Sequence, residues 1–332
     1  MHVLLSATAH DRFWPRVARS GVAPVVLCDD GRLSLADGSA ACLDEVRPEV
    51  AWGTSDVFPD LAKRRRFFDL LRRARSLKWY QSFAAGFDGP VYRDLAARGV
   101  RVTNAHVNDI PIAEFVLRAV LDHFQRAEAW RAAAAERRWE PHDYREVHGS
   151  TWLVVGLGSV GTAVARRARA FGATVIGCRR HPSPDDPADR VVTPDRLGDV
   201  AGEADVVVLA APANDATNAL VGEAFLAAMK QGSVLVNVAR GTLVDDRALL
   251  AALDRGVPEV AVLDVFATEP LPGDHPYWHH PAVVLTPHNA AGGTGRYERQ
   301  AVLFRENLDR FLAGEPLRND VTEEILGLVE GA

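Results

Sequence analysis

Three apolar runs in the second half of the chain are each followed by a side chain that can bind charge or carry a proton. Arg240, Asp264 and His288 stand directly after these runs, which have the length and composition of buried strands. The carboxyl ends of parallel strands meet at one edge of a sheet, so we expect the three side chains to face a common crevice. A guanidinium, a carboxylate and an imidazole together suit proton transfer at a small anionic molecule.

The same part of the chain fits the reduction of a 2-oxo acid, which requires a hydride on carbon and a proton on oxygen. His288 is the expected proton donor, and Glu269 is the carboxylate expected to raise its pKa and fix its tautomer. Arg240 is expected to bind the substrate carboxylate and polarise the carbonyl group. Taken singly, such a histidine is more often structural and such an arginine is more often an ion-pair partner. Their joint position favours catalysis.

A hydride source is indicated by a glycine pattern nearer the N-terminus. Gly156, Gly158 and Gly161 form G-x-G-x-x-G between the apolar strand 151–155 and a helical stretch. In a dinucleotide site the first glycine permits a tight turn, the second lets backbone approach a pyrophosphate, and the third lets helix pack on strand. A further predicted strand at 173–178 completes a βαβ unit, which favours a dinucleotide site over an ordinary glycine turn.

The residues after that second strand bear on which dinucleotide is bound. An NAD site normally has Asp or Glu there to accept hydrogen bonds from the ribose hydroxyls, whereas this chain has Arg179, Arg180 and His181. Two guanidinium groups suit a 2′-phosphate. We therefore expect NADP(H) to be preferred, with NAD(H) also possible. The alternative is that both arginines are solvated surface residues.

Alternating strand-like and helical segments predict the architecture. In the first part of the chain the predicted strands are 2–7, 25–28, 50–53, 78–83 and 101–103, with helices at 60–74 and 91–98. In the second part the predicted strands are 151–155, 173–178, 205–210, 233–237, 260–264 and 283–286. The helix 109–124 is apolar on most sides, as expected of a helix buried between domains or subunits. The chain is predicted to end in the helix 298–312.

Together these motifs resemble those of the D-isomer-specific 2-hydroxyacid dehydrogenases, over nearly the whole chain. The matching blocks are 156–161, 237–241, 263–272 and 286–288. The resemblance implies that Arg240, Glu269 and His288 are the catalytic trio and that Asp264 contacts the nicotinamide amide. Related formate dehydrogenases have Gln where this chain has Glu269, so formate oxidation is not expected.

The resemblance also implies binding residues around the trio. The implied cofactor contacts are Gly156, Gly158, Ser159, Val160, Gly161, Arg179, Arg180, Ala211, Pro212, Thr217, Val238 and Asp264. The expected substrate contacts are Arg240, the backbone of Ala85 and Gly86, and Trp52 at another strand end. An ordinary glycine turn is the alternative for the Ala85–Gly86 loop. The paired arginines and the aromatic pair Tyr277–Trp278 resemble the family's NADPH-using glyoxylate/hydroxypyruvate reductases.

Composition limits the class of protein. The 332 residues are 48% hydrophobic and 25% charged, typical of a soluble globular enzyme, and this length favours two domains. The net charge of −6 argues against a nucleic-acid-binding surface, and no apolar run approaches a membrane span. Cys28, Cys42 and Cys178 lack metal-ligand spacing, so no metal site is expected. The N-terminus has the pattern of a strand rather than a signal peptide, so we expect a cytoplasmic protein.

These observations predict an α/β protein of two doubly wound parallel-sheet domains. The family's first domain is discontinuous, so the resemblance implies a flavodoxin-like substrate-binding domain over 1–103 and 288–332 and a Rossmann dinucleotide-binding domain over 104–287. The predicted activity is NAD(P)H-dependent reduction of a small 2-oxo acid, such as glyoxylate or hydroxypyruvate, to the D-2-hydroxy acid by a homodimer paired through helix 109–124. Two alternatives remain open: a non-catalytic dinucleotide sensor resembling the family's corepressors, and oxidation of another small anion such as phosphite.

Overall fold

The computed structural model describes residues 1–57, 60–84, 86–87 and 89–330. They form two compact units, one made of 1–108 with 294–332 and the other of 109–293. The boundaries predicted from the sequence fall earlier, after residues 103 and 287, and the assignment of substrate and cofactor binding to the two units stays a prediction. Within the described residues, no helix is both long and apolar enough to cross a membrane.

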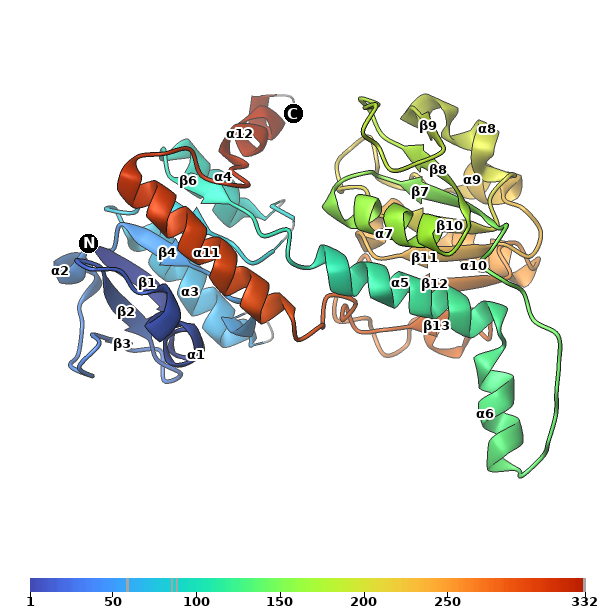
Figure 1. Cartoon of the computed structure of the whole chain (residues 1–332), viewed down its shortest axis with the longest axis horizontal. Helices are drawn as coiled ribbons and strands as arrows, with labels where there is room; N and C mark the ends of the chain where they lie inside the picture. The colour runs from blue at the N-terminus through green and yellow to red at the C-terminus, as the bar shows by residue number, and fades with distance from the viewer. Residues whose placement is uncertain (58–59, 85, 88, 331–332) are drawn as a thin grey trace. The chain divides into compact units, whose positions relative to one another are not determined.

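The described part of the first unit contains a six-stranded sheet with the order β3-β2-β1-β4-β5-β6 (Figure 1). Its strands are β1 (His2–Ser6), β2 (Ala23–Leu27), β3 (Leu33–Ser34), β4 (Val50–Trp52), β5 (Trp79–Gln81) and β6 (Arg101–Thr103). All neighbours are parallel except β2 and β3, which pair antiparallel at one edge. Apart from β3, this is the flavodoxin-like order, in which the direction of winding reverses between β1 and β4.

Helices cover both faces of this sheet, because the alternate side chains of its strands are apolar on both sides. One face holds α1 (Ala7–Val17) and α11 (Arg296–Ala313). The other holds α2 (Leu43–Val46), α3 (Leu61–Arg73), α4 (Pro90–Ala97) and α12 (Thr322–Glu330). On the first face, Trp52 and Trp79 stack on Phe304 of α11 with ring centroids 4.2 and 5.4 Å apart.

The described part of the second unit contains a seven-stranded sheet with the order β13-β12-β11-β10-β7-β8-β9, parallel throughout. Its strands are β7 (Thr151–Val155), β8 (Thr174–Cys178), β9 (Arg190–Val192), β10 (Val206–Leu209), β11 (Val234–Asn237), β12 (Val260–Leu263) and β13 (Val283–Leu285). The winding reverses between β7 and β10, so the turn after β7 lies at the switch point where such sheets bind ligands. The predicted fold class, two doubly wound α/β sheets, is confirmed.

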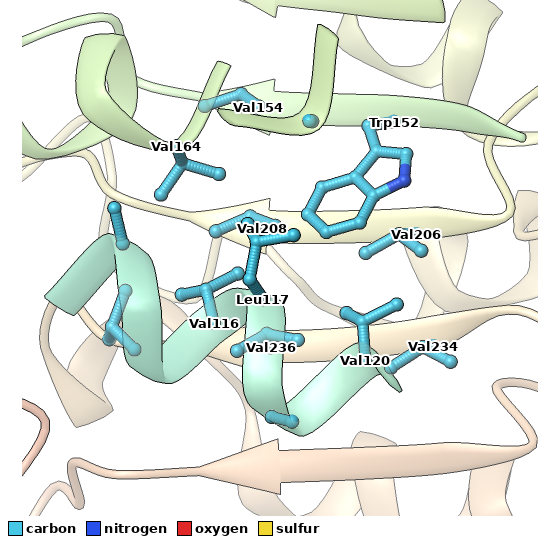
Figure 2. Close-up of a cluster of buried hydrophobic side chains, with 14 of the residues drawn as sticks. Val116, Leu117, Val120, Trp152, Val154, Val164, Val206, Val208, Val234 and Val236 are labelled. Atoms are coloured by element: carbon cyan, nitrogen blue, oxygen red, sulfur yellow. The ribbon is translucent and has the colours of Figure 1, made fainter. Parts of the chain in front are cut away.

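Helices also cover both faces of the second sheet. One face holds α5 (Asp109–Phe124) and α7 (Ser159–Ala170), and the other holds α8 (Leu197–Ala201), α9 (Glu223–Ala228) and α10 (Asp246–Asp254). Figure 2 shows the first core, in which side chains of α5 and α7 meet those of three strands: Val116, Leu117, Val120, Trp152, Val154, Val164, Val206, Val208, Val234 and Val236. The helix α6 (Ala127–Ala135) extends away from this sheet (Figure 1).

The elements that were not predicted from the sequence include β3, β9 and the helix α12. The strands β3 and β9 have two and three residues and lie at the edges of the two sheets. The helix α12 follows the helix that was predicted to be the last one. Its buried Ile325 belongs to the core of the first unit, and the N–H of Val321 just before it donates to the carbonyl oxygen of Val102 at 2.9 Å.

Candidate catalytic and cofactor site

Glycines shape the turn between β7 and α7 at two points where a side chain would collide with backbone. Gly156 has φ +96°, and a Cβ there would lie 2.6 Å from the backbone nitrogen of Ala211. A Cβ on Gly161 would lie 1.8 Å from the carbonyl oxygen of Gly156. The turn is therefore tight and α7 packs closely against it, as a dinucleotide-binding turn requires.

The middle glycine, Gly158, leaves the N-terminus of α7 open. It is the N-cap residue, no described side chain accepts a hydrogen bond from the first amides of the helix, and a Cβ on it would meet no atom within 4 Å. A helix of twelve residues with uncapped N–H groups offers donors and partial positive charge to an anion. The turn therefore fits a pyrophosphate, and Ser159 and Val160 form the first turn of the helix beside it.

The next strand ends on the same edge of the sheet carry the other predicted cofactor contacts. Ala211 and Pro212 follow β10, and Val238 follows β11. The hydroxyl of Thr217 donates to the carbonyl oxygen of Pro212 at 2.8 Å and accepts from the N–H of Asn214 at 2.8 Å. Thr217 therefore closes its own loop, and its contact with a phosphate stays a prediction.

The two arginines after β8 have different surroundings. Nη1 of Arg179 donates to Oδ1 of Asp186 at 2.5 Å, and the Asp186 side chain is only 4% exposed. Arg180 is exposed, and it has no ion pair with any described residue. The sequence predicted both as contacts for a 2′-phosphate, but it did not reveal that one of them already has a partner.

Arg240 is fixed by the loop that follows β11. Its Nη1 donates to the carbonyl oxygen of Ala239 at 2.8 Å, and the side-chain amide of Asn237 donates to its carbonyl oxygen at 3.0 Å. A Cβ on Gly241 would lie 1.9 Å from the carbonyl carbon of Phe266, so this loop crosses directly against the loop after β12. The close crossing brings Arg240 near the segment that carries the predicted catalytic carboxylate.

His288 and Glu269 form a direct pair. Nδ1 of His288 lies 2.7 Å from Oε2 of Glu269, and Oε1 of Glu269 accepts from the N–H of Phe266 at 3.0 Å. The His288 side chain is 51% exposed, so its ring remains accessible. Its backbone has φ +50°, a left-handed conformation that is uncommon for a residue other than glycine.

Asp264 holds the turn that carries His288. Its Oδ1 accepts from the hydroxyl of Thr286 at 2.6 Å and the N–H of Asn289 at 2.8 Å, and its Oδ2 accepts from the N–H of Ala290 at 2.9 Å. Its carbonyl oxygen accepts from the N–H of His288 at 2.8 Å. Asp264 is 2% exposed. Its observed bonds are therefore to this turn, and its predicted contact with a nicotinamide amide stays a prediction.

The electrostatics of the pair favour a protonated imidazole. The hydrogen bond to Glu269 raises the pKa of His288 against the opposing effects of burial and the charge of Arg240, and the charges of Glu269 and Asp264 act in the same direction as the bond. Burial alone would raise the pKa of Glu269, but its hydrogen bonds from His288 and Phe266 bring it below the ordinary value. Burial raises the pKa of Asp264 despite its three hydrogen bonds. The arrangement can thus hold a proton on His288 near neutral pH.

The predicted substrate residues of the first unit differ in how far the structure describes and exposes them. Ala85 lies outside the described residues, and Gly86 is half-buried in a segment without regular secondary structure. The indole of Trp52 is fully buried between Phe13 and Phe304, so it is not exposed to a ligand, and the predicted contact of Trp52 with substrate stays a prediction. The strand end was identified correctly, but α11 covers this side chain.

The aromatic pair predicted near the site is divided between core and surface. Tyr277 is 2% exposed, and its hydroxyl donates to Oδ1 of Asp246 at 2.8 Å, which is a structural role. The Trp278 ring is half exposed, and its Nε1 donates to the carbonyl oxygen of Pro272 at 2.8 Å. The sequence did not reveal that Asp186 is the partner of Arg179, or that the Thr286–Ala290 turn is the partner of Asp264. The Thr-Pro-His pattern pointed to that turn, and no local signal pointed to Asp186.

Comparisons with known proteins point to the family that the sequence motifs resemble. Residues 117–290 match the NAD binding domain of the D-isomer specific 2-hydroxyacid dehydrogenases. The glyoxylate reductase of Thermococcus kodakarensis is 32% identical over 283 residues, which cover 82% of this chain and 84% of that protein.

Solved structures are similar over almost the entire chain. A D-isomer specific 2-hydroxyacid dehydrogenase family protein from Aeromonas salmonicida has a TM-score of 0.78 and 28% identity, covering 96% of this chain and 97% of its own. A D-isomer specific 2-hydroxyacid dehydrogenase from Xanthobacter autotrophicus Py2, solved with NADPH and MES, has a TM-score of 0.74 and 28% identity, covering 98% of each chain.

Proposed function

The chain belongs to the D-isomer-specific 2-hydroxyacid dehydrogenase family, and from this membership we propose that it reduces glyoxylate, hydroxypyruvate or a similar small 2-oxo acid to the D-2-hydroxy acid, preferring NADPH. As a member of this family it is an NAD(P)-dependent oxidoreductase that acts on 2-oxo and 2-hydroxy acids. The observation that carries the proposal is the 2.7 Å pair of His288 and Glu269, with Arg240 near enough to influence both of their pKa values.

The chemistry follows from these side chains. The nicotinamide, when bound, supplies the hydride. His288 uses Nδ1 for Glu269, and its Nε2 has no partner among the described residues, so Nε2 is the atom that gives a proton to the substrate oxygen. Glu269 stabilises the imidazolium before the transfer and holds the ring's orientation. Arg240 binds the substrate carboxylate through its fork of N–H donors and polarises the neighbouring carbonyl.

The preference for NADPH rests on the two arginines after β8, where an NAD site has a carboxylate. A charge-assisted hydrogen bond to a 2′-phosphate contributes about 1.5–3 kcal/mol, enough for a preference of about tenfold or more. The relative solved with NADPH supports this assignment by its similarity to the whole chain. Steady-state kinetics with both cofactors tests it, since an equal or higher kcat/KM with NADH would contradict it.

The substrate class is tested by NADPH oxidation against a panel of 2-oxo acids of increasing side-chain size. We expect glyoxylate and hydroxypyruvate to give the highest kcat/KM, and chiral analysis of the hydroxypyruvate product to give the D isomer. Absence of turnover with every 2-oxo acid, together with tight NADPH binding, would contradict the proposed reaction and favour a dinucleotide sensor.

We further propose a homodimer formed through the second unit. The predicted contact is α5, whose Phe115 and Leu121 remain only partly buried within that unit. Beyond α6 the connector exposes Trp139 almost completely, at 96%, which is unusual for a side chain of this size on a monomer's surface. Light scattering coupled to size-exclusion chromatography gives the mass in solution, and a monomer at micromolar concentration would contradict the proposal.

A further inference from the structure

The loop after β8, residues 179–189, carries two arginines of which only one is unpaired. We propose, on the basis of the proposed preference for NADPH, that Asp186 is a positioning residue that commits Arg179 to the structure of this loop and leaves Arg180 to bind the 2′-phosphate. The two arginines, which the sequence makes equivalent, then have different tasks.

The carboxylate of Asp186 joins two points of the loop. Its Oδ1 accepts from Nη1 of Arg179 at 2.5 Å, and its Oδ2 accepts from the N–H of Ser183 at 2.7 Å. The N–H of Asp186 donates to the carbonyl oxygen of Ser183 at 3.1 Å, and its carbonyl oxygen accepts from the N–H of Ala188 at 2.9 Å. With its side chain 4% exposed, Asp186 is an internal part of the loop rather than a surface charge.

The backbone on either side of Arg179 is anchored to the sheet. The N–H of Arg179 donates to the carbonyl oxygen of Val192 in β9 at 3.1 Å, and the carbonyl oxygen of Cys178 accepts from the N–H of Gly156 at 2.8 Å. The loop therefore starts beside the glycine turn, where the adenosine part of a dinucleotide is bound in this fold. Fixed at its main chain and at its guanidinium, Arg179 is a rigid support for the next residue.

The charges along the loop single out Arg180. The carboxylate of Asp186 offsets the charge of Arg179, and Asp189 pairs with Arg169 at 3.2 Å. Asp185 is exposed, and its N–H donates to the hydroxyl of Ser183 at 3.3 Å. Arg180 is exposed and has no ion pair with a described residue, so its whole fork of donors is available to a phosphate.

Direct binding separates the two tasks without any turnover. Isothermal titration of the full chain with adenosine 2′,5′-bisphosphate and with 5′-AMP compares two ligands that differ only in the 2′-phosphate. Arg180→Ala should weaken the bisphosphate by about tenfold or more and leave 5′-AMP unchanged. Arg179→Ala and Asp186→Asn should each weaken bisphosphate binding by the same, smaller factor. The double variant should bind the bisphosphate no more weakly than either single variant, because both substitutions break the same Arg179–Asp186 pair.

Controls keep the result specific to the 2′-phosphate. Asp199→Asn breaks an exposed Asp–Arg pair with Arg196 in the same unit and should leave the affinities for both ligands unchanged. The ratio of the two affinities is not altered by a general loss of stability, and the unfolding temperature of Asp186→Asn reports such a loss separately.

Two results would overturn the assignment: a larger loss of bisphosphate binding in Arg179→Ala than in Arg180→Ala, or losses in Arg179→Ala and Asp186→Asn that multiply in the double variant. Either can occur in a protein that reduces glyoxylate with NADPH, in which case the proposed function stands. Conversely, the expected binding pattern in a protein without turnover would uphold this assignment and contradict the proposed reaction.

Discussion

The first strand of each unit is followed by a helix, and the two helix N-termini are satisfied in opposite ways. In the first unit β1 runs directly into α1, and the hydroxyl of Ser6 accepts a hydrogen bond from the N–H of Ala9 at 3.1 Å. In the second unit glycines separate β7 from α7, and Gly158 stands at the N-cap without a side chain. One helix is capped by the protein itself, and the other is left available to an anion.

The difference shows that a doubly wound sheet does not by itself make a dinucleotide site. Both units have parallel strands and a reversal of winding, yet of the two turns that follow β1 and β7, it is the one after β7 that leaves its helix without a side-chain cap. The charged residues Arg240, Glu269 and His288 also come from strand ends of the second unit alone. Function is therefore carried by a few residues at one edge of a common architecture.

The largest effect is expected from removing the proposed proton donor, which lies in the second unit. His288→Ala should lower kcat for NADPH-dependent glyoxylate reduction by about 10²–10⁴-fold, the usual contribution of general acid catalysis. The matched control is His279→Ala, an exposed histidine of the same unit, which should retain the parent's kcat. A nearly active His288→Ala enzyme would show that the proton comes from elsewhere.

Arg240→Lys should come next, because lysine keeps the charge but has no planar fork for a carboxylate. Loss of a charge-assisted bond of about 1.5–3 kcal/mol should lower kcat/KM for glyoxylate by about tenfold to a hundredfold while NADPH binding stays normal. Arg255→Lys, an exposed arginine at the end of α10, serves as the control. Kinetics close to those of the parent would make Arg240 a structural residue.

Gly158→Ser gives α7 of the second unit a serine at its N-cap, as α1 of the first unit has in Ser6. Its φ of −75° and the free space around it accept a side chain, so stability should be unchanged or raised by a few tenths of a kcal/mol. The new side chain takes the space that a pyrophosphate needs, so we expect NADPH affinity to fall about tenfold, the effect of one such contact. Titration by fluorescence measures it. Unchanged affinity would mean that the open helix N-terminus has no part in cofactor binding.

Glu269→Gln should move a pH profile rather than abolish activity. The pKa of His288 is raised mainly by its hydrogen bond to Glu269, and the proposed reduction uses a protonated His288. The reductive kcat therefore falls as pH rises through that pKa, while the oxidative rate rises. The neutral amide removes the charge, so the reductive profile should shift to lower pH. Profiles of kcat in both directions provide the measurement, and an unshifted profile would contradict the pairing.

The smallest effect concerns the first unit. Ser6→Ala removes the side-chain cap of α1 and should lower the free energy of unfolding by about 1 kcal/mol, as measured by urea denaturation. The affinity for NADPH should not change, since this cap belongs to the other unit. A large loss of NADPH affinity in Ser6→Ala would contradict the view that the turn after β1 serves stability alone.

Local patterns made much of the fold predictable. Strand β7 and the glycine turn follow from an apolar run and from the G-x-G-x-x-G pattern, and both signals lie within a dozen residues of the sequence. The predicted ranges of helix α5 and strand β6 agree with the structure to the residue. The short strand β9 was missed because its residues are set by pairing with β8 rather than by their own period.

Long-range packing produces contacts at the site that the sequence did not reveal. Trp52 stands at a strand end, as expected, but Phe304 of α11 lies against its ring, and this partner is far along the chain. Arg179 and Asp186 meet through an irregular loop with three prolines, where no repeat relates one residue to another. The position of both arginines after a strand predicted them as phosphate contacts, but it could not show that Arg179 already pairs with Asp186.

The left-handed backbone of His288 has a consequence for engineering the enzyme. A non-glycine residue at φ +50° stores about 1 kcal/mol or more, here held in place by the hydrogen bonds of Asp264. Glycine would adopt the same conformation without that penalty but would bring no imidazole. Glycine at position 288 would thus relieve backbone strain but remove both the imidazole and its hydrogen bond to Glu269, so any thermostability selection that varies this position must screen for turnover at the same time.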